Sequence, residues 1–460
     1  MKTALRHPPE LELRDVAATD LSETIRRGSR LISRKVGLIR RVAETRYQAQ
    51  DPVVFAAGVM PADFSRCVSG GVAADAGGAG DTAAMAMVSA IGEAVERHCA
   101  CLPDRAATVF GSYRELEGDA VSPDLLRLFS RDQIAGFGPH GPDYFDEDTP
   151  IAWVWGYSLS RRRPRLVPAA LVYLNHRPAE HEAPIGLNAS TGLAAGGTRE
   201  EAILSGLLET VERDAFTIAW MHRRAGRRID IDDEDTTRRL RHRLWADRPS
   251  VDVKCFDLTT DVAIPVLFIV MRRQAECGPV ACVGAASRLS PRHAIRKCIQ
   301  EAGQNFPYLR QLLHNEKDWQ PAPDFSNVTN FDYHFLHYLK RPDLVPEAFA
   351  FFDECEERVA LSQLPDRSTG RVLADLEYCI GSLGEAGYEV IVTDITTPDI
   401  SDVGFSVVRV IVPGLVPLHG HHLRPFLGAR RLFDAPSRLE WNRPGWSAEA
   451  GLNPFPHPFP

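Results

Sequence analysis

The chain has 460 residues, of which 44% are hydrophobic and 25% are charged, and its formal net charge at pH 7 is -8. These values are typical of a globular protein with a large core, and they exclude a disordered or fibrous chain. The acidic balance also argues against broad nucleic-acid binding, for which a basic domain or stripe is expected.

The amino-terminal residues and the apolar runs argue against export and against membrane insertion. Met1 leads into a polar, proline-containing stretch without the apolar run of a secretory signal. The longest apolar run, residues 403–418, is broken by Arg409 and Pro413, so it predicts a buried strand followed by a turn. Nine scattered cysteines without a CxxC pair favour reduced thiols. We therefore expect a cytoplasmic protein with no membrane partner.

Residues 1–50 predict a helical lead-in, and residues 51–460 predict the main domain. In the lead-in, Asp20 and Glu23 are placed to cap a short amphipathic helix. The main domain is expected to end in a proline-rich tail.

Two glycine-rich loops, residues 70–80 and 186–197, each precede a predicted helix. The first helix extends to about Ala100 and carries apolar residues at helical spacing. The second opens at Thr198, where Thr198-x-x-Glu201 forms a capping box. Such loops offer backbone N–H groups that can cradle phosphates, although no GxxxxGK[ST] motif is present.

The rest of the main domain alternates predicted strands, loops and helices. Polar loops are expected over residues 136–150 and 315–333. A third helix is expected to begin at Ser290-Pro291, where the missing N–H of proline costs nothing. The expected strands are 151–159, 165–174, 256–271, 279–286, 389–394 and 406–412, and a further helix is expected over 374–387.

The first two of these helices carry an internal repeat that reads SxxxExxER. Positions i, i+4, i+7 and i+8 share one helical face, so each helix presents a hydroxyl, two carboxylates and a guanidinium on one stripe. The residues are Ser89, Glu93, Glu96 and Arg97 in the first copy, and Ser205, Glu209, Glu212 and Arg213 in the second.

The paired carboxylates of this repeat predict a site for a cation. Two carboxylates three residues apart repel each other, and more strongly if the helix face is buried. Oxygen ligands favour a hard cation such as Mg²⁺, which commonly bridges to substrate phosphates, and the arginines can pair with phosphate oxygens. One ExxER sequence is common on a solvated helix face, but two copies behind glycine-rich loops favour a site. The third predicted helix repeats the spacing with Glu301 and Gln304.

The second copy lies in residues 191–214, TGLAAGGTREEAILSGLLETVERD, and this segment resembles the YcaO family of ATP-binding enzymes. The resemblance extends from about Gly70 to Pro460. It implies an α+β fold with mixed or antiparallel sheets, in which three helices hold ATP and Mg²⁺. The chain departs from many members at two positions, with Gly197 where they have Asn and Ala79 where they have Lys.

The resemblance also implies roles for the repeated residues. Mg²⁺ is expected on four glutamates, Glu93, Glu96, Glu209 and Glu212. The nucleotide is expected to be surrounded by Ser89, Arg97, Glu201, Ser205, Arg213, Glu301 and Gln304.

The chain ends in a PxPxP sequence, Pro456-His-Pro458-Phe-Pro460. Such a tail is either a disordered end or a stiff polyproline segment that delivers its free carboxylate to a fixed place. In azoline-forming members of the YcaO family, a terminus of this kind resembles part of the active site. The resemblance thus implies catalytic roles for the Pro460 carboxylate, as a base, and for Arg213, which neutralises charge on the γ-phosphate.

The activity that the resemblance implies is a cyclodehydratase that uses Mg-ATP to phosphorylate a backbone amide oxygen. Cys, Ser or Thr of a ribosomally made precursor peptide would become azolines. Two alternatives stay open, formation of a thioamide or amidine at the same site, and a non-catalytic accessory subunit that binds nucleotide. An E1-like or leader-peptide-binding partner protein is expected, together with a homodimer.

Two further stretches are expected to have structural roles. His419-Gly-His421-His422 is expected to be a solvated turn beside two prolines rather than a metal site. Residues 232–243 run from acidic to basic side chains, a pattern that suits the dipole of a helix.

Overall fold

Three β-sheets organise the computed structural model, which describes residues 10–45, 54–64, 76–104, 107–138, 141–186, 189–231, 251–275, 278–439 and 451–460. Their strand orders are β1-β2-β3, β11-β10-β9-β8-β12, and β4-β5-β13-β14-β7 with β6 paired to β5. In the described part of the chain every strand pair is antiparallel except β12 with β8. The strands are β1 (Ile39–Glu44), β2 (Phe55–Pro61), β3 (Ala76–Gly80), β4 (Thr108–Gly111), β5 (Ile151–Ser158), β6 (Arg163–Pro168), β7 (Leu193–Gly196), β8 (Arg227–Asp230), β9 (Val251–Asp257), β10 (Val266–Ala275), β11 (Gly278–Ser287), β12 (Arg358–Ala360), β13 (Ile391–Asp394) and β14 (Ser406–Ile411).

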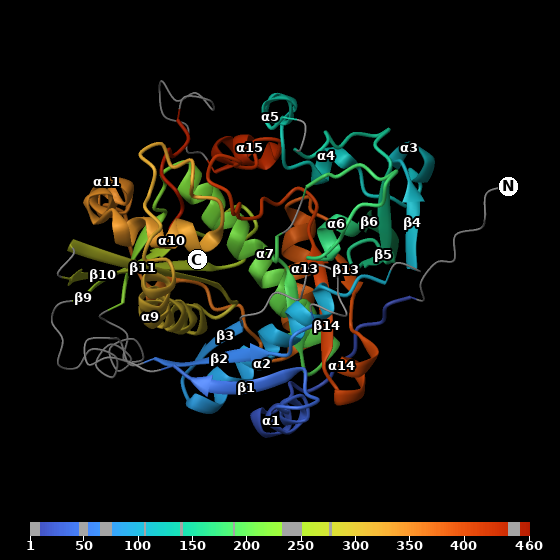
Figure 1. Ribbon diagram of the computed structural model, residues 1–460, viewed down its shortest axis with the longest axis horizontal. Coiled ribbons are helices and arrows are strands. Elements are labelled where there is room, and N and C mark those ends of the chain that lie inside the picture. Colours follow the sequence, from blue (N-terminus) through green and yellow to red (C-terminus); the bar gives the residue numbers. More distant parts are fainter. Residues whose placement is uncertain are drawn as a thin grey trace.

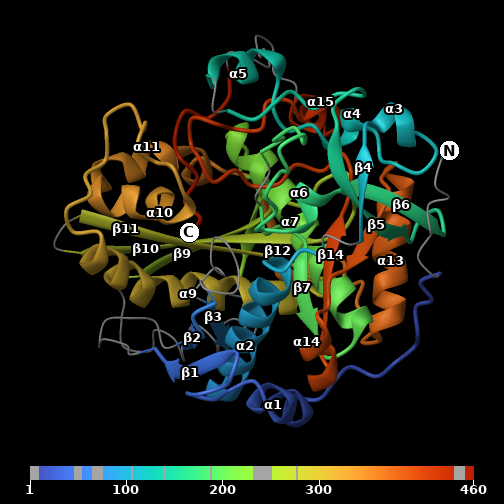
Figure 2. The same cartoon turned by 45° about the vertical axis from the view of Figure 1, so that its right-hand side comes forward.

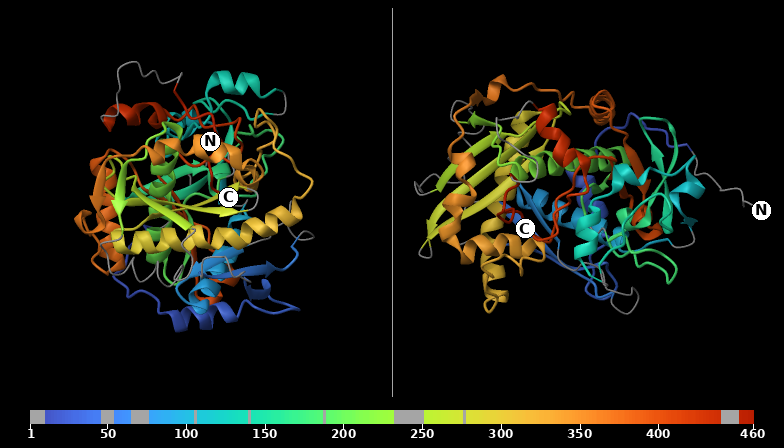
Figure 3. Two further views of the ribbon diagram at one scale, coloured as in Figure 1. Left: turned by 90° about the vertical axis from the view of Figure 1, so that its left-hand side faces the viewer. Right: turned by 90° about the horizontal axis from the view of Figure 1, so that it is seen from above.

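Three long helices connect these sheets (Figure 1). Helix α2 packs on the three-stranded sheet and on β7, whereas α7 lies between the other two sheets, against β14 and β7 on one side and β10 and β11 on the other (Figure 2). Helix α9 runs along the five-stranded sheet (Figure 3). The helices are α1 (Leu21–Ser29), α2 (Ala83–Ala100), α3 (Tyr113–Leu116), α4 (Pro123–Leu126), α5 (Arg131–Gly136), α6 (Ala169–Val172), α7 (Arg199–Met221), α9 (Pro291–Asn315), α10 (Phe331–Lys340), α11 (Val345–Ala348), α12 (Ala350–Asp353), α13 (Val372–Glu385), α14 (Pro398–Val403) and α15 (Arg430–Arg438), with 3-10 turns at Pro342–Leu344 and Leu361–Gln363.

The predicted glycine-rich loops are in part strands, β3 and β7, and this corrects the expectation from sequence. A Cβ on Gly78 of β3 would come within 2.3 Å of the backbone of α2, and one on Gly196 of β7 within 2.6 Å of the backbone of α7. Gly284 of β11 repeats the arrangement, because its Cβ would lie 2.3 Å from the backbone of α9. The glycines therefore permit a strand to pack closely on the helix that follows it, in three successive strand–helix units.

The starts of α7 and α9 follow the predicted positions by different means. The capping box at Thr198 and Glu201 is confirmed, because each side chain accepts the backbone N–H of the other residue. Ser290 stands at the N-cap of α9 but makes no cap hydrogen bond, and its hydroxyl instead donates to Asp366 at 2.9 Å. The position of α9 was thus predicted correctly and the bond at its cap was not.

The predicted lead-in combines a helix with a strand. Helix α1 begins after Asp20, whose carboxylate accepts the Glu23 N–H at 2.8 Å, as expected. Strand β1 follows within residues 1–50 and pairs with β2, so the three-stranded sheet crosses the predicted domain boundary at residue 50. The alternation that marks β1 covers too few residues to stand out beside a helix signal.

Two predicted strands are shorter in the structure. The strand expected over 256–271 is interrupted between β9 and β10, because Asp257 accepts both the N–H and the O–H of Thr259 and closes a turn. The strand expected over 165–174 ends at Pro168 and continues as α6.

Other expectations from the sequence agree with the structure. The apolar run over 403–418 contains the buried strand β14 and a turn at Gly414, as predicted. The cysteines placed in the described ranges are free thiols. No helix within those ranges combines the length and the apolar character needed to cross a bilayer. The predicted acidic-to-basic helix over 232–243 lies outside the described residues.

Candidate active site

The first copy of the repeat lies on α2, and its carboxylates form hydrogen bonds with two strands. Glu93 Oε2 accepts the N–H of Gly77 in β3 at 2.8 Å, and Glu93 Oε1 lies 3.1 Å from Arg97 Nη2. Glu96 belongs to the next turn of α2, and its Oε1 accepts the N–H of Ala195 in β7 at 2.9 Å. The two carboxylates of α2 therefore join its own strand to the strand of the following unit.

The second copy, on α7, repeats these contacts one unit further along the chain. Glu209 Oε2 accepts the N–H of Gly192, next to β7, at 3.3 Å. Glu212 Oε2 accepts the N–H of Ser287, the last residue of β11, at 3.2 Å. Arg213 Nε lies 3.8 Å from Glu209 and 3.6 Å from Glu212, so the guanidinium is shared between the two carboxylates.

Helix α9 of the third strand–helix unit binds back to the first unit. The side chains of Arg296 and Gln300 donate to the carboxylate of Asp81, which links β3 to α2. Glu301 lies close enough to α7 for its charge to raise the pKa of a glutamate there. The buried Oε1 of Gln304 has no hydrogen-bond partner among the described residues. The three predicted helices thus form a ring, with polar side chains joining each unit to the next.

The glutamates of these helices are close enough to repel one another. Burial raises the pKa of Glu96 to about 8, and the charges of Glu93 and Glu209 add to the rise. Burial also raises the pKa of Glu212 to about 8, with further contributions from Glu301 and Glu209. The pKa of Glu209 is itself raised by burial. A cation bound among these carboxylates would relieve the repulsion and compensate for their burial.

The donor chemistry of this cluster fits Mg²⁺, although its side chains are engaged elsewhere in the structure. In the part of the chain described here, no three His, Cys, Asp or Glu side chains are already arranged to hold a metal ion. Each of the four predicted glutamates instead accepts a backbone N–H. Oxygen-only donors on two neighbouring helices, close enough for their charges to interact, remain the kind of set that a hard divalent cation requires.

Arg409 of β14 is a charged residue near the cluster that the sequence interpretation missed. Burial lowers the pKa of Arg409 to about 10, the carboxylate of Glu209 opposes that change, and the charge of Arg97 adds to it. From sequence, Arg409 appeared only as an interruption of an apolar run. A lone arginine inside a buried strand indicates a functional or paired group, because burial of an ionised side chain is costly unless a partner compensates its charge.

The two predicted serines lie one turn before the first glutamate of each helix. Ser89 Oγ donates to the carbonyl of Ala79 in β3 at 3.3 Å. Ser205 is exposed on α7. The geometry therefore leaves both hydroxyls on the acidic face of their helices, as predicted from the periodicity.

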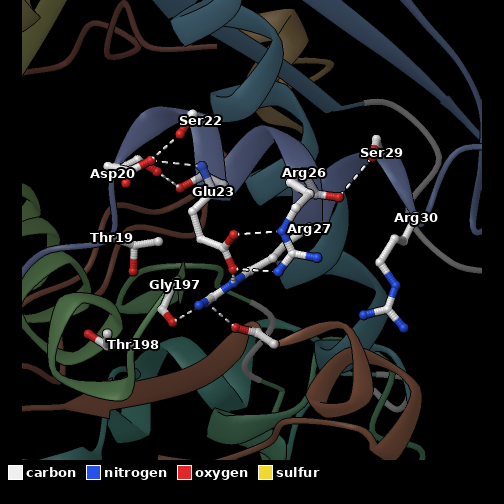
Figure 4. Close-up of polar contacts among 12 residues, drawn as sticks. Thr19, Asp20, Ser22, Glu23, Arg26, Arg27, Ser29, Arg30, Gly197 and Thr198 are labelled. Atoms are coloured by element: carbon white, nitrogen blue, oxygen red, sulfur yellow. Dashed lines mark hydrogen bonds and ion pairs between the residues drawn. The ribbon is translucent and has the colours of Figure 1, made fainter.

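Glu201 is held by the amino-terminal segment rather than by the acidic cluster. Its carboxylate accepts the N–H and the O–H of Thr19, both at 2.9 Å, and the N–H of Thr198 at 2.9 Å. Arg27 of α1 donates to the carbonyl of Gly197 at 2.6 Å beside it (Figure 4). A Cβ on residue 197 would lie 2.2 Å from Thr19 Oγ1, which accounts for glycine there. The carboxylate predicted to contact the nucleotide is thus already hydrogen-bonded.

The C-terminal tail, residues 451–460, is built into the structure between α7 and α10. The indole N–H of Trp220 donates to the carbonyl of Phe455 at 3.2 Å, and the hydroxyl of Tyr338 donates to the carbonyl of Pro456. All three ribbon views place the C-terminus within the molecule, next to the five-stranded sheet (Figures 1 to 3). The tail is therefore a fixed segment and not a disordered end.

Phe459 near the end of the tail reaches the second copy of the repeat. The ring of Phe459 packs edge-on against Phe216 of α7, with centroids 4.5 Å apart. The guanidinium of Arg213 lies over the same Phe459 ring, 5.0 Å from its centroid. The contact between the tail and Arg213 is therefore made by Phe459, the residue before Pro460.

The histidines expected in a solvated turn over 419–422 are instead packed around this tail. The rings of His334 and His457 stack with centroids 3.7 Å apart, and the Nδ1–H of His334 donates to the carbonyl of His457 at 3.2 Å. His457 Nε2–H donates to the carbonyl of His419 at 2.7 Å, and burial lowers the pKa of His419 to about 3. The prediction of a solvated turn was wrong because the distant tail and α10 cover it.

Comparison with known proteins places these features in a family. Residues 77–416 match the family described as YcaO cyclodehydratase, ATP- and Mg²⁺-binding. An uncharacterized protein of Methanothermobacter thermautotrophicus is 28% identical over 344 residues, which cover 74% of this chain and 80% of that protein. The predicted family and its cofactors, ATP and Mg²⁺, are confirmed.

Three solved structures share the fold. A heterocyclase in complex with substrate and cofactor has a TM-score of 0.80 and 25% identity, over 98% of this chain and 59% of that one. YcaO from Methanopyrus kandleri, bound with AMPPCP and Mg²⁺, has a TM-score of 0.62 and 24% identity, over 86% and 91%. An E. coli microcin synthetase complex with pro-MccB17 bound gives 0.56 and 16%, over 90% and 96%. The predicted α+β class is confirmed, and the chain spans less than two thirds of the first heterocyclase.

Proposed function

The chain belongs to the YcaO family, and on that premise we propose that it is a peptide cyclodehydratase that forms azolines with ATP and Mg²⁺. Its substrate would be Cys, Ser or Thr of a ribosomally made precursor peptide. The observation that carries the proposal is the convergence of the two acidic pairs of α2 and α7. The inner glutamates of the pairs are Glu96, which is half-buried, and Glu212, which is buried, and each has a pKa raised to about 8, which a bound cation would reverse.

The residues of the ring divide into two proposed groups. Glu93, Glu96, Glu209 and Glu212 would hold Mg²⁺. The nucleotide would be bound by Ser89, Arg97, Glu201, Ser205, Arg213, Glu301 and Gln304. The orphan Oε1 of Gln304 supports this division, because a buried acceptor without a donor is costly unless a ligand supplies one. If Glu201 binds the nucleotide, its carboxylate must either release its hydrogen bonds from Thr19 or accept a further one from the nucleotide.

The reaction assigned to the site begins with attack on a backbone carbonyl of the peptide. The Cys, Ser or Thr side chain adds to the preceding carbonyl and gives up its proton, and the oxyanion formed takes the γ-phosphoryl group of ATP. ADP is the product of that transfer. Phosphate then leaves with the former carbonyl oxygen while the amide N–H proton is lost, which forms the C=N bond of the ring that the attack had closed. Arg213, shared between two carboxylates and close to the tail, is placed to stabilise the transferred group.

The tail supports the azoline reaction over the alternatives. Proton removal needs a base, and the carboxylate of Pro460 would be that base; the contact of the preceding residue, Phe459, with Arg213 supports this role. Formation of a thioamide or amidine would use an external nucleophile at the same phosphorylated amide. A non-catalytic accessory subunit would have no need of so closely packed a terminus.

Partners form part of the proposal. We infer a precursor peptide as substrate and a leader-peptide-binding or E1-like protein as partner, with a homodimer as the assembly. The likeness to a synthetase complex with a peptide bound supports the first two inferences through the shared fold. The acidic net charge is consistent with partners other than nucleic acid.

Mass spectrometry of the peptide product tests the proposal. Incubation of a candidate precursor peptide with the enzyme, Mg²⁺ and ATP should remove one water for each modified residue and release one phosphate for each. Exchange of an oxygen for sulfur would instead identify the thioamide reaction. Tight Mg-ATP binding with no mass change, in the presence of every candidate partner, would support the accessory subunit.

A further inference from the structure

A cavity lies beside the acidic cluster, where strand β14 ends and the chain enters β7. It is open on one side, and its empty space, counted out into open solvent, is about 610 Å³. One wall is apolar and is formed by Leu125 and Leu128 at α4, Leu171 of α6 and Phe426. A branched or aromatic side chain gains free energy by leaving water for such a wall.

Arg409 lines the same cavity, and two of its three donor nitrogens lack acceptors among the described residues. Its side chain is 4% exposed, and Nη2 donates to the carbonyl of Ala189 at 2.7 Å. Nε and Nη1 have no hydrogen-bond partner among the described residues. Buried donors without acceptors are rare and costly, so this guanidinium is suited to a ligand that brings an acceptor.

The cavity adjoins the residues assigned to the reaction. Thr210 lines it and follows Glu209 on α7, and Thr191 lines it and precedes Gly192, whose N–H binds Glu209. The charge of Glu209 also acts on Arg409. A ligand in the cavity would therefore lie next to the cluster, on the side of α7 that packs against β14.

We propose that this cavity is a subsite for the peptide substrate, which inserts an apolar side chain while one of its backbone carbonyls accepts hydrogen bonds from Arg409. The inference rests on the proposed function, and it specifies which feature of the peptide sequence the enzyme recognises. A peptide fits better than a second anion, because the remaining lining is apolar except for Thr191 and Thr210, and a neutral carbonyl satisfies the free N–H groups. The enzyme would then favour a large apolar residue close to the residue that it modifies.

Photolabelling with a short probe tests the subsite without knowledge of the natural peptide. The probe is N-acetyl-photo-leucine methylamide, which has an aliphatic diazirine side chain between two backbone carbonyls. Irradiation with the full chain and mapping of the adducts should place labels on the cavity lining, at residues 125–128, 171 or 426. Excess N-acetyl-leucine methylamide should suppress these labels, and N-acetyl-glycine methylamide should not.

Matched variants decide whether the cavity is responsible. Leu125 and Leu423 are both 50% exposed, but only Leu125 is among the cavity-lining residues named for this site. Leu125→Asp should reduce labelling on the order of tenfold, the value of one apolar contact, and Leu423→Asp should leave it unchanged. Arg409→Lys should also reduce labelling, because it removes the forked donors.

Three results would overturn the subsite. These are labels outside the cavity, labelling that survives both Leu125→Asp and Arg409→Lys, and suppression of labelling by AMPPCP with Mg²⁺, which would identify a nucleobase pocket. Calorimetry of Mg-ATP binding on the same samples separates this inference from the proposed function. Mg-ATP binding without cavity labelling refutes the subsite alone, and cavity labelling without Mg-ATP binding refutes the proposed function.

Discussion

The two copies of the repeat, on α2 and α7, make the same backbone contacts but have different arginines. In both copies the inner glutamate, Glu96 or Glu212, accepts an N–H from the strand of the next unit. Arg97 pairs with Glu93 at 3.1 Å, whereas Arg213 lies more than 3.5 Å from either glutamate and stacks on the C-terminal tail. The shared contacts build the ring, and the proposed function assigns the second copy, whose arginine contacts the tail, to the reacting groups.

The tail gives the largest expected effect. A protein made with a C-terminal amide on Pro460 keeps the packing of Phe459 but loses the terminal acid. Cyclisation should fall by about 100-fold or more, as expected for loss of a general base, while Mg-ATP affinity stays within about twofold. Assays of phosphate release and peptide mass measure the first quantity, and calorimetry measures the second. Full cyclisation by the amide would eliminate Pro460 as the base.

Exchange of each arginine for lysine tests the asymmetry between the copies. Arg213→Lys should lower kcat by about 100-fold, because a forked donor that stabilises transferred charge is lost. Arg97→Lys should mainly raise the KM for ATP, by about tenfold. Its effect should be limited to binding, because lysine retains the ion pair with Glu93 in weaker form. Equal effects on kcat would contradict the distinction drawn between the copies.

The pH dependence tests what the copies share. A carboxyl whose pKa is raised to about 8 in the folded state holds a proton that the unfolded chain releases near pH 4.5. The free energy of unfolding of the metal-free protein should therefore be largest below about pH 4.5, and it should fall as the pH rises from there through about 8. Mg-ATP should remove the decline, because it binds the ionised carboxylates. Melting temperatures measured from about pH 5 to pH 9, with and without Mg-ATP, give the curves.

Single substitutions apportion that pH dependence. Glu96→Gln and Glu212→Gln each remove one of the titrating groups, so each should make the decline shallower, and Glu209 should account for part of what remains. A variant that leaves the curve unchanged would show that its copy does not hold a raised carboxyl.

The glycine packing gives a smaller effect, on stability. Gly78→Ala places a Cβ 2.3 Å from the backbone of α2, and we expect a loss of about 2 to 4 kcal/mol from overpacking. Gly92→Ala on the same helix meets nothing within 4 Å and should stabilise by about 0.5 to 1 kcal/mol. Urea unfolding of the two variants measures both values. An unaffected Gly78→Ala would mean that the β3–α2 contact is looser than described.

Periodicity and local motifs revealed the features that lie within one element. The SxxxExxER stripes and the Thr198 capping box depend on spacing along a helix, and both follow from the sequence. The bond from Glu96 to β7, the Thr19 contacts of Glu201 and the donors of Arg409 join residues about 100 or more positions apart. Such contacts are set by tertiary packing, which local patterns do not encode.

The histidine turn shows the same limit. His419 was interpreted from its proline-rich neighbours, but the tail and α10 decide its burial. For the tail, composition left a disordered end and a fixed segment open, and the structure shows a fixed segment held by Trp220 and Tyr338.

Calorimetry of Mg-dependent ATP binding tests most directly whether the two strand–helix units share one site. The wild-type chain is compared with Glu93→Gln, Glu209→Gln and the double variant. The account predicts binding that requires Mg²⁺, weakened by either single change and lost in the double variant, with a coupling between the two changes that independent sites would lack. Additive, independent losses, or Mg²⁺-dependent binding that survives the double change, would contradict a single nucleotide site formed by α2 and α7.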